Sequence, residues 1–308
     1  MVIKTIPLRE GRDDVTLTTY LVDDSAEMMA GRKRPAVLIA PGGGYLMCSD
    51  REAEPVALAF AAMGYHAFVL RYSVYFQAGE DPDYTKKMNP RPEYCHPAPL
   101  YDYALAMKYI YEQADQWLVD SERIAICGFS AGCHNTAMYA AYWNQPLVKE
   151  LLGVEEGYRP AAAILGYGIF DNYTMKDTVP EIKYADLCDA YRVALMGSEM
   201  PSDEVCRETS PIMQINPDFP PTFLWATFGD DCVPVIQTTK MAEKLIEKEI
   251  PTEVHIFEKG CHGLSLATQA TSPALTTIVP EVAKWVGMAE SWMQQRFRLP
   301  LPEKTIWD

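Results

Sequence analysis

The hydrophobic pattern alternates along the chain between short apolar runs and longer helix-like stretches. Residues 15–22 have the β-branched, alternating character of an early strand. Further strands are predicted mainly by continuous apolar runs, which are typical of strands covered on both faces: 35–40, 65–72, 123–127, 161–170, 221–228 and 252–257. Helix-like stretches occupy 54–63, 101–117, 131–143, 237–248 and 276–296. This alternation predicts an α/β fold with a mostly parallel central sheet covered by helices on both faces.

Two segments break this alternation. Residues 73–99 contain four prolines before Pro99, many aromatic side chains and little periodicity. Residues 172–211 are rich in Met, Tyr and acidic side chains. We interpret both as irregular insertions, because a long loop inside a compact domain is usually functional or disordered. At 308 residues the chain could form two domains, but one α/β domain over 1–308 with two insertions accounts for the pattern.

Composition and charge narrow the range of partners. With 48% hydrophobic residues the chain can bury a large core, and its formal net charge is -15. An acidic surface repels nucleic acid and anionic membranes, so we expect neither as a partner. The same acidity can serve solubility alone. A neutral small-molecule substrate is compatible with this charge, whereas a polyanionic substrate is not.

The cysteines and the N-terminal residues bear on the compartment. Eight cysteines are scattered without a C-x-x-C pair, which disfavours a zinc knuckle. A chain of this length does not need disulfides, so we expect mostly reduced thiols. Residues 1–7 show no secretory-type apolar stretch, and no apolar run reaches the roughly 20 residues that span a bilayer. We therefore expect a cytoplasmic protein, although a chain whose leader had been removed would look the same.

The strongest chemical signal is the sequence Gly-Phe-Ser-Ala-Gly at 128–132, between a predicted strand and a predicted helix. A serine on so tight a turn requires neighbours without side chains, which Gly128 and Gly132 supply. The turn would raise the Ser130 hydroxyl above the sheet edge. It would also place the Ala131 N–H at a helix N-terminus, where developing negative charge is stabilised. The pattern G-x-S-x-G also occurs by chance, but this context indicates a nucleophile elbow.

A histidine and a carboxylate near later strand ends suit the roles of base and orienting acid. A serine hydroxyl needs a base to take its proton, and a carboxylate fixes the tautomer of that base. His262 follows the strand 252–257 in a glycine-flanked loop, and Asp230 follows the strand 221–228. Loops at the carboxyl ends of strands are where catalytic side chains belong in such sheets. We therefore predict a triad of Ser130, Asp230 and His262.

Alternatives remain for these roles. Asp231 could replace Asp230 or be a solvated turn residue, and Asp171 is a more distant candidate at the end of the preceding strand. A lone loop histidine such as His262 is often solvated and idle. The remaining histidines are weaker candidates, which we place in strands, on the helix after Ser130 or along the substrate pocket: His66, His255, His134 and His96.

The sequence Pro-Gly-Gly-Gly at 41–44 directly follows the strand 35–40. Consecutive glycines expose N–H groups without side chains, so a substrate carbonyl can come within hydrogen-bonding range. A phosphate-binding loop is one alternative, but no Gly-Lys-Ser/Thr follows. A plain flexible turn is another. We predict that the oxyanion donors are Gly43, Gly44 and Ala131. We also predict that Tyr45 and His96 line the substrate pocket.

Taken in order, these motifs resemble those of the α/β-hydrolase esterases. The matching motifs are Gly-Gly-Gly, Gly-Phe-Ser-Ala-Gly, Asp-x-x-Val-Pro and Gly-x-His-Gly, with secondary matches at 51–57 and Asp102. The chain looks most similar to the lipase/acetylxylan-esterase group of carbohydrate esterases, from about Val15 to the final helix. Many members carry a histidine where this chain has Pro41. That histidine shapes the loop, so the resemblance implies a different loop shape and disfavours a long-chain lipase.

The resemblance implies an α/β-hydrolase fold and serine hydrolysis of short acyl esters through an acyl-enzyme, without metal or cofactor. The expected substrate is a small-molecule or oligosaccharide ester, such as an acetylated xylo-oligosaccharide. The insertions 73–99 and 172–211 would form a cap over Ser130 and decide the substrate. A peptidase of the same fold, a general short-chain carboxylesterase and a ligand receptor built on an inactive hydrolase are the alternatives. We leave the oligomeric state open, with a homodimer as one option.

Overall fold

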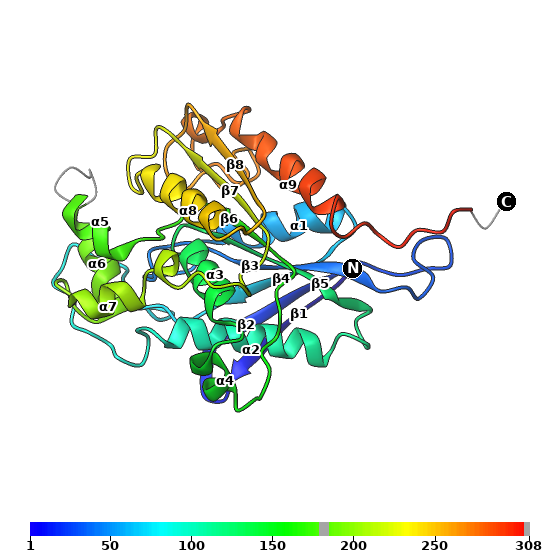
Figure 1. Cartoon of the computed structure of the whole chain (residues 1–308), viewed down its shortest axis with the longest axis horizontal. Helices are drawn as coiled ribbons and strands as arrows, with labels where there is room; N and C mark the ends of the chain where they lie inside the picture. Colours follow the sequence, from blue (N-terminus) through cyan, green and yellow to red (C-terminus); the bar gives the residue numbers. More distant parts are fainter. Residues whose placement is uncertain (179–184, 305–308) are drawn as a thin grey trace.

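An eight-stranded sheet carries the fold in the computed structural model, which describes residues 1–178 and 185–304 (Figure 1). The strand order is β1-β2-β4-β3-β5-β6-β7-β8. β2 pairs antiparallel with β1 and β4, and the remaining neighbours are parallel. The strands are β1 Val2–Arg9, β2 Arg12–Leu21, β3 Arg34–Ala40, β4 His66–Arg71, β5 Val119–Phe129, β6 Ala162–Gly166, β7 Thr222–Thr227 and β8 Thr252–Phe257. The prediction of a mostly parallel sheet is confirmed.

Helices cover both faces of this sheet. Side chains of α2, α3 and α8 pack into the core on one face, and side chains of α1 and α9 pack into the core on the other. The helices in the described ranges are α1 Glu54–Ala62, α2 Ala98–Glu112, α3 Ser130–Tyr142, α4 Pro146–Leu152, α5 Asn172–Thr178, α6 Ala185–Met196, α7 Asp203–Glu208, α8 Ile236–Glu247 and α9 Trp285–Gln294.

The middle of the sheet shows why its strands read as continuous apolar runs. Every residue of β3 is buried. Leu38 belongs to the core on one face and Val37 and Ile39 to the core on the other, because successive side chains of a strand point to opposite sides. A strand between two helical layers therefore has no face exposed to solvent, so its apolar residues do not alternate with polar ones.

Several parts of the chain differ from the prediction, among them the short helix α4, which was not predicted. β1 was not predicted, because this edge strand is largely exposed and lacks the continuous apolar run that identified the central strands. In the segment 172–211, the described residues 172–178 and 185–211 are not irregular but contribute α5, α6 and α7, and residues 179–184 lie outside the described ranges. The predicted closing helix is interrupted as well, since Pro280 cannot continue a helical hydrogen-bond ladder and α9 begins only at Trp285.

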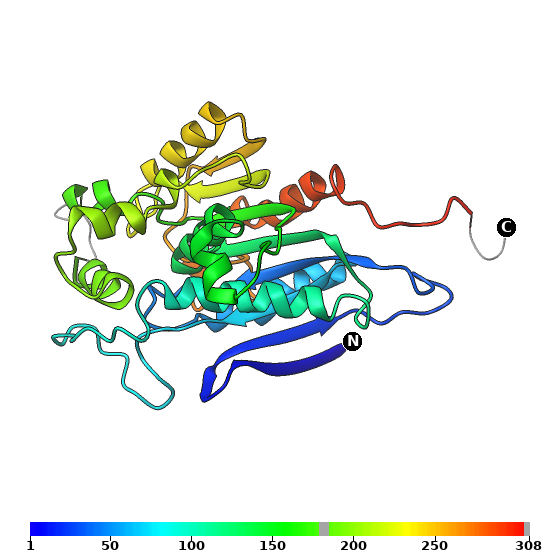
Figure 2. The ribbon, with the colours of Figure 1, turned by 60° about the horizontal axis from the view of Figure 1, so that its bottom comes forward.

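The two insertions lie together at one end of the sheet. Figures 1 and 2 show α5, α6 and α7 gathered there, with the extended segment that precedes α2 beside them. The two insertions are in direct contact, because the His96 N–H donates to the Leu195 carbonyl at 2.8 Å. In the described ranges, no helix is long and apolar enough to cross a bilayer.

Candidate active site

The turn that carries Ser130 depends on two close approaches of glycine. β5 ends at Phe129 and α3 begins at Ser130, whose φ of 50° lies in the left-handed region. A Cβ on Gly128 would lie 2.4 Å from the Gly132 oxygen, and one on Gly132 would lie 2.2 Å from the Ala40 oxygen. No side-chain carbon can occupy such positions. The glycines of the motif therefore let strand and helix meet, and the turn holds Ser130 in a strained conformation.

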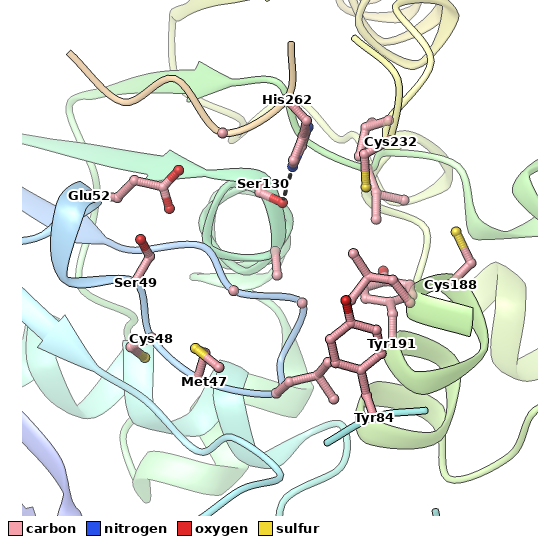
Figure 3. A pocket seen from close by; sticks show the side chains of 18 of the residues that line it. Met47, Cys48, Ser49, Glu52, Tyr84, Ser130, Cys188, Tyr191, Cys232 and His262 are labelled. Carbon is pink, nitrogen blue, oxygen red and sulfur yellow. Dashed lines mark hydrogen bonds between the residues drawn. The ribbon is translucent and has the colours of Figure 1, made fainter. Parts of the chain in front are cut away.

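Three side chains from separate loops meet at this turn. Ser130 Oγ lies 2.8 Å from His262 Nε2, and Figure 3 shows His262 directed at the serine. His262 Nδ1 lies 2.8 Å from one oxygen of Asp230. The other Asp230 oxygen accepts the Cys232 and Val233 N–H groups at 2.9 and 2.8 Å. The structure thus brings the three residues predicted as a triad into one hydrogen-bonded chain.

These contacts determine how His262 carries its proton. An ionised carboxylate only accepts hydrogen bonds, so Nδ1 donates to Asp230 and Nε2 is left to accept the Ser130 hydroxyl proton. The side chain of Asp230 is 1% exposed and that of His262 is 18% exposed. Burial alone would lower the pKa of His262. The charge and hydrogen bond of Asp230, helped by the charges of Glu52 and Asp231, outweigh burial and raise this pKa above its ordinary value.

The other acids considered for the triad have different positions. Asp171 accepts hydrogen bonds from the N–H and the hydroxyl of Thr174 at 3.0 and 2.6 Å, at the start of α5. Asp231 adds negative charge near His262, but the hydrogen bond of His262 goes to Asp230. The geometry therefore selects Asp230 for the orienting position.

The two side chains predicted for the substrate pocket lie elsewhere. Tyr45 is 1% exposed, its ring packs edge-on against Tyr72, and its hydroxyl bonds to His134 Nδ1 at 2.7 Å. Its large ring is held in this inner aromatic cluster and does not face the substrate. His96 packs between the insertions, beside Leu195. Burial lowers the pKa of His96 and of His134 to about 4, so both rings are neutral near pH 7.

A cavity of about 550 Å³ opens above Ser130 and His262. Both insertions contribute to its walls, with Tyr84 from the first and Met175, Leu187, Tyr191 and Arg192 from the second. Figure 3 shows Tyr84 and Tyr191, which belong to the two insertions, across the pocket from Glu52. The sequence did not single out these wall residues, because both segments were interpreted as irregular, so no inward-facing side of a helix was assigned in either.

The predicted oxyanion donors also face this cavity. Gly43, Gly44 and Ala131 line it together with Ser130. Among the described residues, the Gly43 and Gly44 N–H groups have no hydrogen-bond acceptor, and Ala131 lies in the first turn of α3, where amides have no partner within the helix. The Gly42 N–H, in contrast, donates to Glu52 at 2.8 Å. The site thus offers amide donors beside a serine and its base, which is the arrangement that acyl transfer requires.

Metal-binding side chains do not gather in the described part of the chain. No three His, Cys, Asp or Glu residues there are grouped so that they could hold a metal ion. All eight cysteines lie within this part, and no disulfide joins any of them. Burial raises the pKa of Cys48, a pocket residue, to about 11, so its thiol is neutral near pH 7.

Comparison with known proteins identifies the relatives of this chain. It is 32% identical over 258 residues to endo-1,4-beta-xylanase B of Butyrivibrio fibrisolvens, an alignment that covers 82% of this chain and 35% of the xylanase. The carboxylesterase Cest-2923 of Lactobacillus plantarum is 26% identical, with a TM-score of 0.77 over 96% of this chain and 98% of that one. An acetyl ester-xyloside bifunctional hydrolase of Caldicellulosiruptor lactoaceticus is 28% identical, with a TM-score of 0.72 over 95% and 96%.

These findings place the chain among the α/β-hydrolases. The profile of the BD-FAE family matches residues 26–245, which is more than half of the chain, and the chain belongs to this family. The resemblance to carbohydrate esterases seen in the sequence is thereby confirmed. The chain spans about a third to a half of the length of the curated relatives that it matches.

Proposed function

We propose that the protein is a serine esterase that removes short acyl groups, acetyl above all, from carbohydrate esters such as acetylated xylo-oligosaccharides. The observation that carries this proposal is the hydrogen-bonded chain from Ser130 through His262 to Asp230, at the base of a cavity of about 550 Å³. A cavity of this size can hold an acyl group together with part of a sugar. A serine with a base and an orienting acid is the arrangement that activates a hydroxyl nucleophile.

The first half of the reaction follows from the positions of these atoms. Ser130 Oγ attacks the ester carbonyl while His262 Nε2, at 2.8 Å, accepts its proton. The carbonyl oxygen becomes an oxyanion, which the N–H groups of Gly43, Gly44 and Ala131 stabilise. Asp230 keeps the His262 ring in place and stabilises its protonated form. The sugar hydroxyl then leaves with the proton from Nε2, and an acyl-Ser130 ester remains.

The second half repeats these steps with water. His262 Nε2 takes a proton from water, whose oxygen attacks the acyl-Ser130 carbonyl. The collapse of the oxyanion breaks the bond to Ser130 Oγ, which recovers its proton from His262. The products are the free carboxylic acid and the regenerated serine.

The choice of a carbohydrate substrate rests on the relatives. A xylanase aligns with 82% of this chain, and an acetyl ester-xyloside hydrolase has the same fold at 28% identity. A neutral acetylated sugar is also compatible with a protein of net charge -15. We further propose that the protein acts in the cytoplasm on small imported oligosaccharides.

Acetate release provides the test. The unmodified protein and Ser130→Ala are incubated with acetylated xylo-oligosaccharides and, separately, with a chromogenic acetate ester. We expect the unmodified protein to release acetate from both and the variant from neither. Activity that survives in Ser130→Ala would contradict the proposed mechanism. Cleavage of the chromogenic ester alone would contradict the sugar assignment and leave the esterase assignment standing.

A general short-chain carboxylesterase is the second candidate. The likeness to the carboxylesterase Cest-2923 favours it, as do the apolar wall residues Leu187 and Met175. Two series of esters separate the candidates: acyl chains from acetyl to hexanoyl on one alcohol, and acetate esters of sugar and simple aliphatic alcohols. Preference for the alcohol over the acyl chain supports the carbohydrate esterase, whereas indifference to the alcohol supports the general enzyme.

A further inference from the structure

Glu52 is a buried acid at the edge of the pocket that takes no part in the triad. It ends the short 3-10 turn η1 (Asp50–Glu52), is 2% exposed, and lines the cavity together with Ser130 and His262. Figure 3 shows its carboxylate on the side of the turn that carries Ser130. Burying a carboxylate is costly unless its oxygens are hydrogen-bonded, so its partners indicate what it does there.

One oxygen of Glu52 holds the segment 41–44 after β3, which carries the proposed donors Gly43 and Gly44 and which we call the oxyanion loop. Oε2 accepts the Gly42 N–H at 2.8 Å. Gly42 is enclosed between this oxygen and the elbow, since a Cβ at that position would lie 2.7 Å from Oε2 and 2.9 Å from the Ser130 Cβ. Gly42 directly precedes Gly43. The position of the Gly43 N–H, one of the proposed oxyanion donors, therefore depends on the bond between Gly42 and Glu52.

The other oxygen of Glu52 is connected through Tyr167 to the loop after β8 that carries His262, which we call the histidine loop. Oε1 accepts the Tyr167 hydroxyl at 2.6 Å, and that hydroxyl in turn accepts the Ser265 N–H at 3.0 Å. Ser265 lies on the same loop as His262. The Tyr167 ring also packs edge-on against the His262 ring, with centroids 5.2 Å apart. One carboxylate thus connects the loop after β3 with the loop after β8.

We propose that Glu52 is a positioning residue that joins the oxyanion loop to the histidine loop and supports the protonated form of His262 during the reaction. The proposal rests on the ester hydrolysis by Ser130, His262 and Asp230 described above. When Ser130 attacks, a positive charge forms on His262 and a negative charge on the substrate oxygen. The negative charge of Glu52 stabilises the protonated His262. Its hydrogen bond to Gly42 keeps the N–H groups of the oxyanion loop directed at the negative substrate oxygen.

Several charged or titratable groups surround His262. They come from the loops after β7, β6 and β8 and from η1, and they comprise Asp230, Asp231, Tyr167, Cys261, Glu52 and Arg51. Burial lowers the pKa of His262, and the acids of this group raise it. Burial also raises the pKa of Tyr167 well above its ordinary value, so Tyr167 remains a neutral donor to Glu52. Removal of the Glu52 charge should therefore lower the pKa of His262.

The test compares Glu52→Gln with the unmodified protein. Glutamine has nearly the same size and can still accept the Gly42 N–H, but it is uncharged. With a chromogenic acetate ester, we expect kcat to fall about tenfold or more while KM stays within about twofold. The acidic limb of the kcat/KM profile should move to lower pH by a few tenths of a unit or more. Glu52→Asp, which keeps the charge, should leave that limb closer to its original pH.

Glu54→Gln is the matched control. Glu54 is an exposed acid two residues further on, so the control changes the net charge equally without touching the pocket. Thermal unfolding of each variant separates loss of the fold from loss of activity. The imidazole titration of His262, followed by NMR, reads the effect of the Glu52 charge without any substrate.

The outcomes separate this proposal from the proposed function. An unmodified protein that cleaves no ester contradicts the proposed function, while a His262 titration that shifts in Glu52→Gln still supports the role of Glu52. A folded Glu52→Gln variant with unchanged kcat and an unchanged titration overturns that role. A lower kcat with an unmoved His262 titration and a lower Tm also overturns it, because Glu52 would then act on stability alone.

Discussion

Gly42 lies so close to Ser130 that it has no room for a side chain. A Cβ on Gly42 would lie 2.9 Å from the Ser130 Cβ and 2.7 Å from the Phe129 carbonyl oxygen. These atoms belong to the elbow and cannot move aside cheaply, so Gly42→Ala must displace the oxyanion loop or the nucleophile. Because misplacement by about 1 Å can cost about 100-fold in rate, we expect kcat/KM on an acetate ester to fall by at least that factor.

Gly287→Ala is the control for this substitution. Gly287 lies in α9, and a Cβ there would meet no atom within 4 Å. Alanine is the better helix former, so this variant should keep full activity and gain about 0.5–1 kcal/mol in free energy of unfolding. Full activity of Gly42→Ala would contradict the packing argument.

Asp230 and Asp231 should differ sharply on substitution. In Asp230→Asn the amide can donate to His262 Nδ1, which stabilises the tautomer that cannot accept the Ser130 proton. We expect kcat to fall by about 10³- to 10⁴-fold, the size of loss known for such a change in other triads. Asp231 acts on His262 through its charge, without the hydrogen bond that His262 makes to Asp230, so Asp231→Asn should cost less than about tenfold. Similar losses in the two variants would argue against Asp230 as the orienting acid.

The pH dependence of activity follows from His262. Burial, which lowers its pKa, is outweighed by Asp230, and the pKa lies above its ordinary value. Ser130 needs the neutral imidazole as its base, so kcat/KM should rise with pH through a midpoint above about 6.5. A pH–rate profile measured at constant ionic strength tests this. A midpoint at or below that value would mean that Asp230 does not act on His262 as the geometry indicates.

The pH dependence of stability should come mainly from buried histidines whose pKa is lowered, in contrast to the raised pKa of His262. Burial lowers the pKa of His66, His96 and His134 to about 4, whereas unfolded histidines titrate near about 6.5. Between these values the unfolded chain binds more protons, so the free energy of unfolding should fall as the pH drops from about 6.5 towards 4. His262, with a raised pKa, instead contributes stability below about pH 6.5 and loses it as the pH rises through its folded value.

Urea unfolding at about pH 7, 6 and 5 measures this slope, and one variant isolates part of it. His96 Nε2 is buried without a hydrogen-bond partner in the described structure and lies 3.7 Å from Glu208 Oε1, with which it would pair only when protonated. His96→Phe therefore removes a titrating group without breaking a hydrogen bond of Nε2. We expect a shallower fall in stability for this variant. An equal slope in both proteins would mean that His96 titrates normally.

The sequence predicted those features that are enforced by local sterics and by complete burial. The elbow could be identified because a Cβ on Gly128 or on Gly132 would lie less than 2.5 Å from atoms of the same turn or of the neighbouring strand, so only glycine fits there. The central strands could be identified because both of their faces are buried, as every residue of β3 shows. Both features can be recognised from residues that are adjacent in the sequence. The order of the triad residues along the chain follows from the order of the strands that precede them.

The missed features depend on contacts between distant parts of the chain. Glu52 lies in a polar sequence that looks exposed, and its burial results from a hydrogen bond to Tyr167, 115 residues away. Tyr45 directly follows the predicted oxyanion glycines, yet it turns inward because His134 and Tyr72 provide partners for its hydroxyl and its ring. Neither the polarity of a residue nor its position in the sequence reveals a hydrogen-bond or packing partner that comes from a distant part of the chain.

The wall opposite the catalytic residues offers a test of acyl specificity. Leu187 lines the cavity, and its Cδ1 lies 3.5 Å from where a Cβ on Gly44 would be, so it stands over the oxyanion loop. Leu187→Ala should make room beside the ester carbonyl. We expect the ratio of kcat/KM for a butyrate ester to that for an acetate ester to rise by about 3- to 10-fold, since a few buried carbon atoms are worth that much in a pocket.

Met200→Ala is the matched control for this prediction, because Met200 belongs to the same insertion but is 89% exposed. Its removal should leave the ratio unchanged. An unchanged ratio in Leu187→Ala as well would mean that the acyl chain does not extend towards α6. The sugar would then occupy that side of the cavity, and the effect of Leu187→Ala should appear instead in KM for acetylated xylo-oligosaccharides.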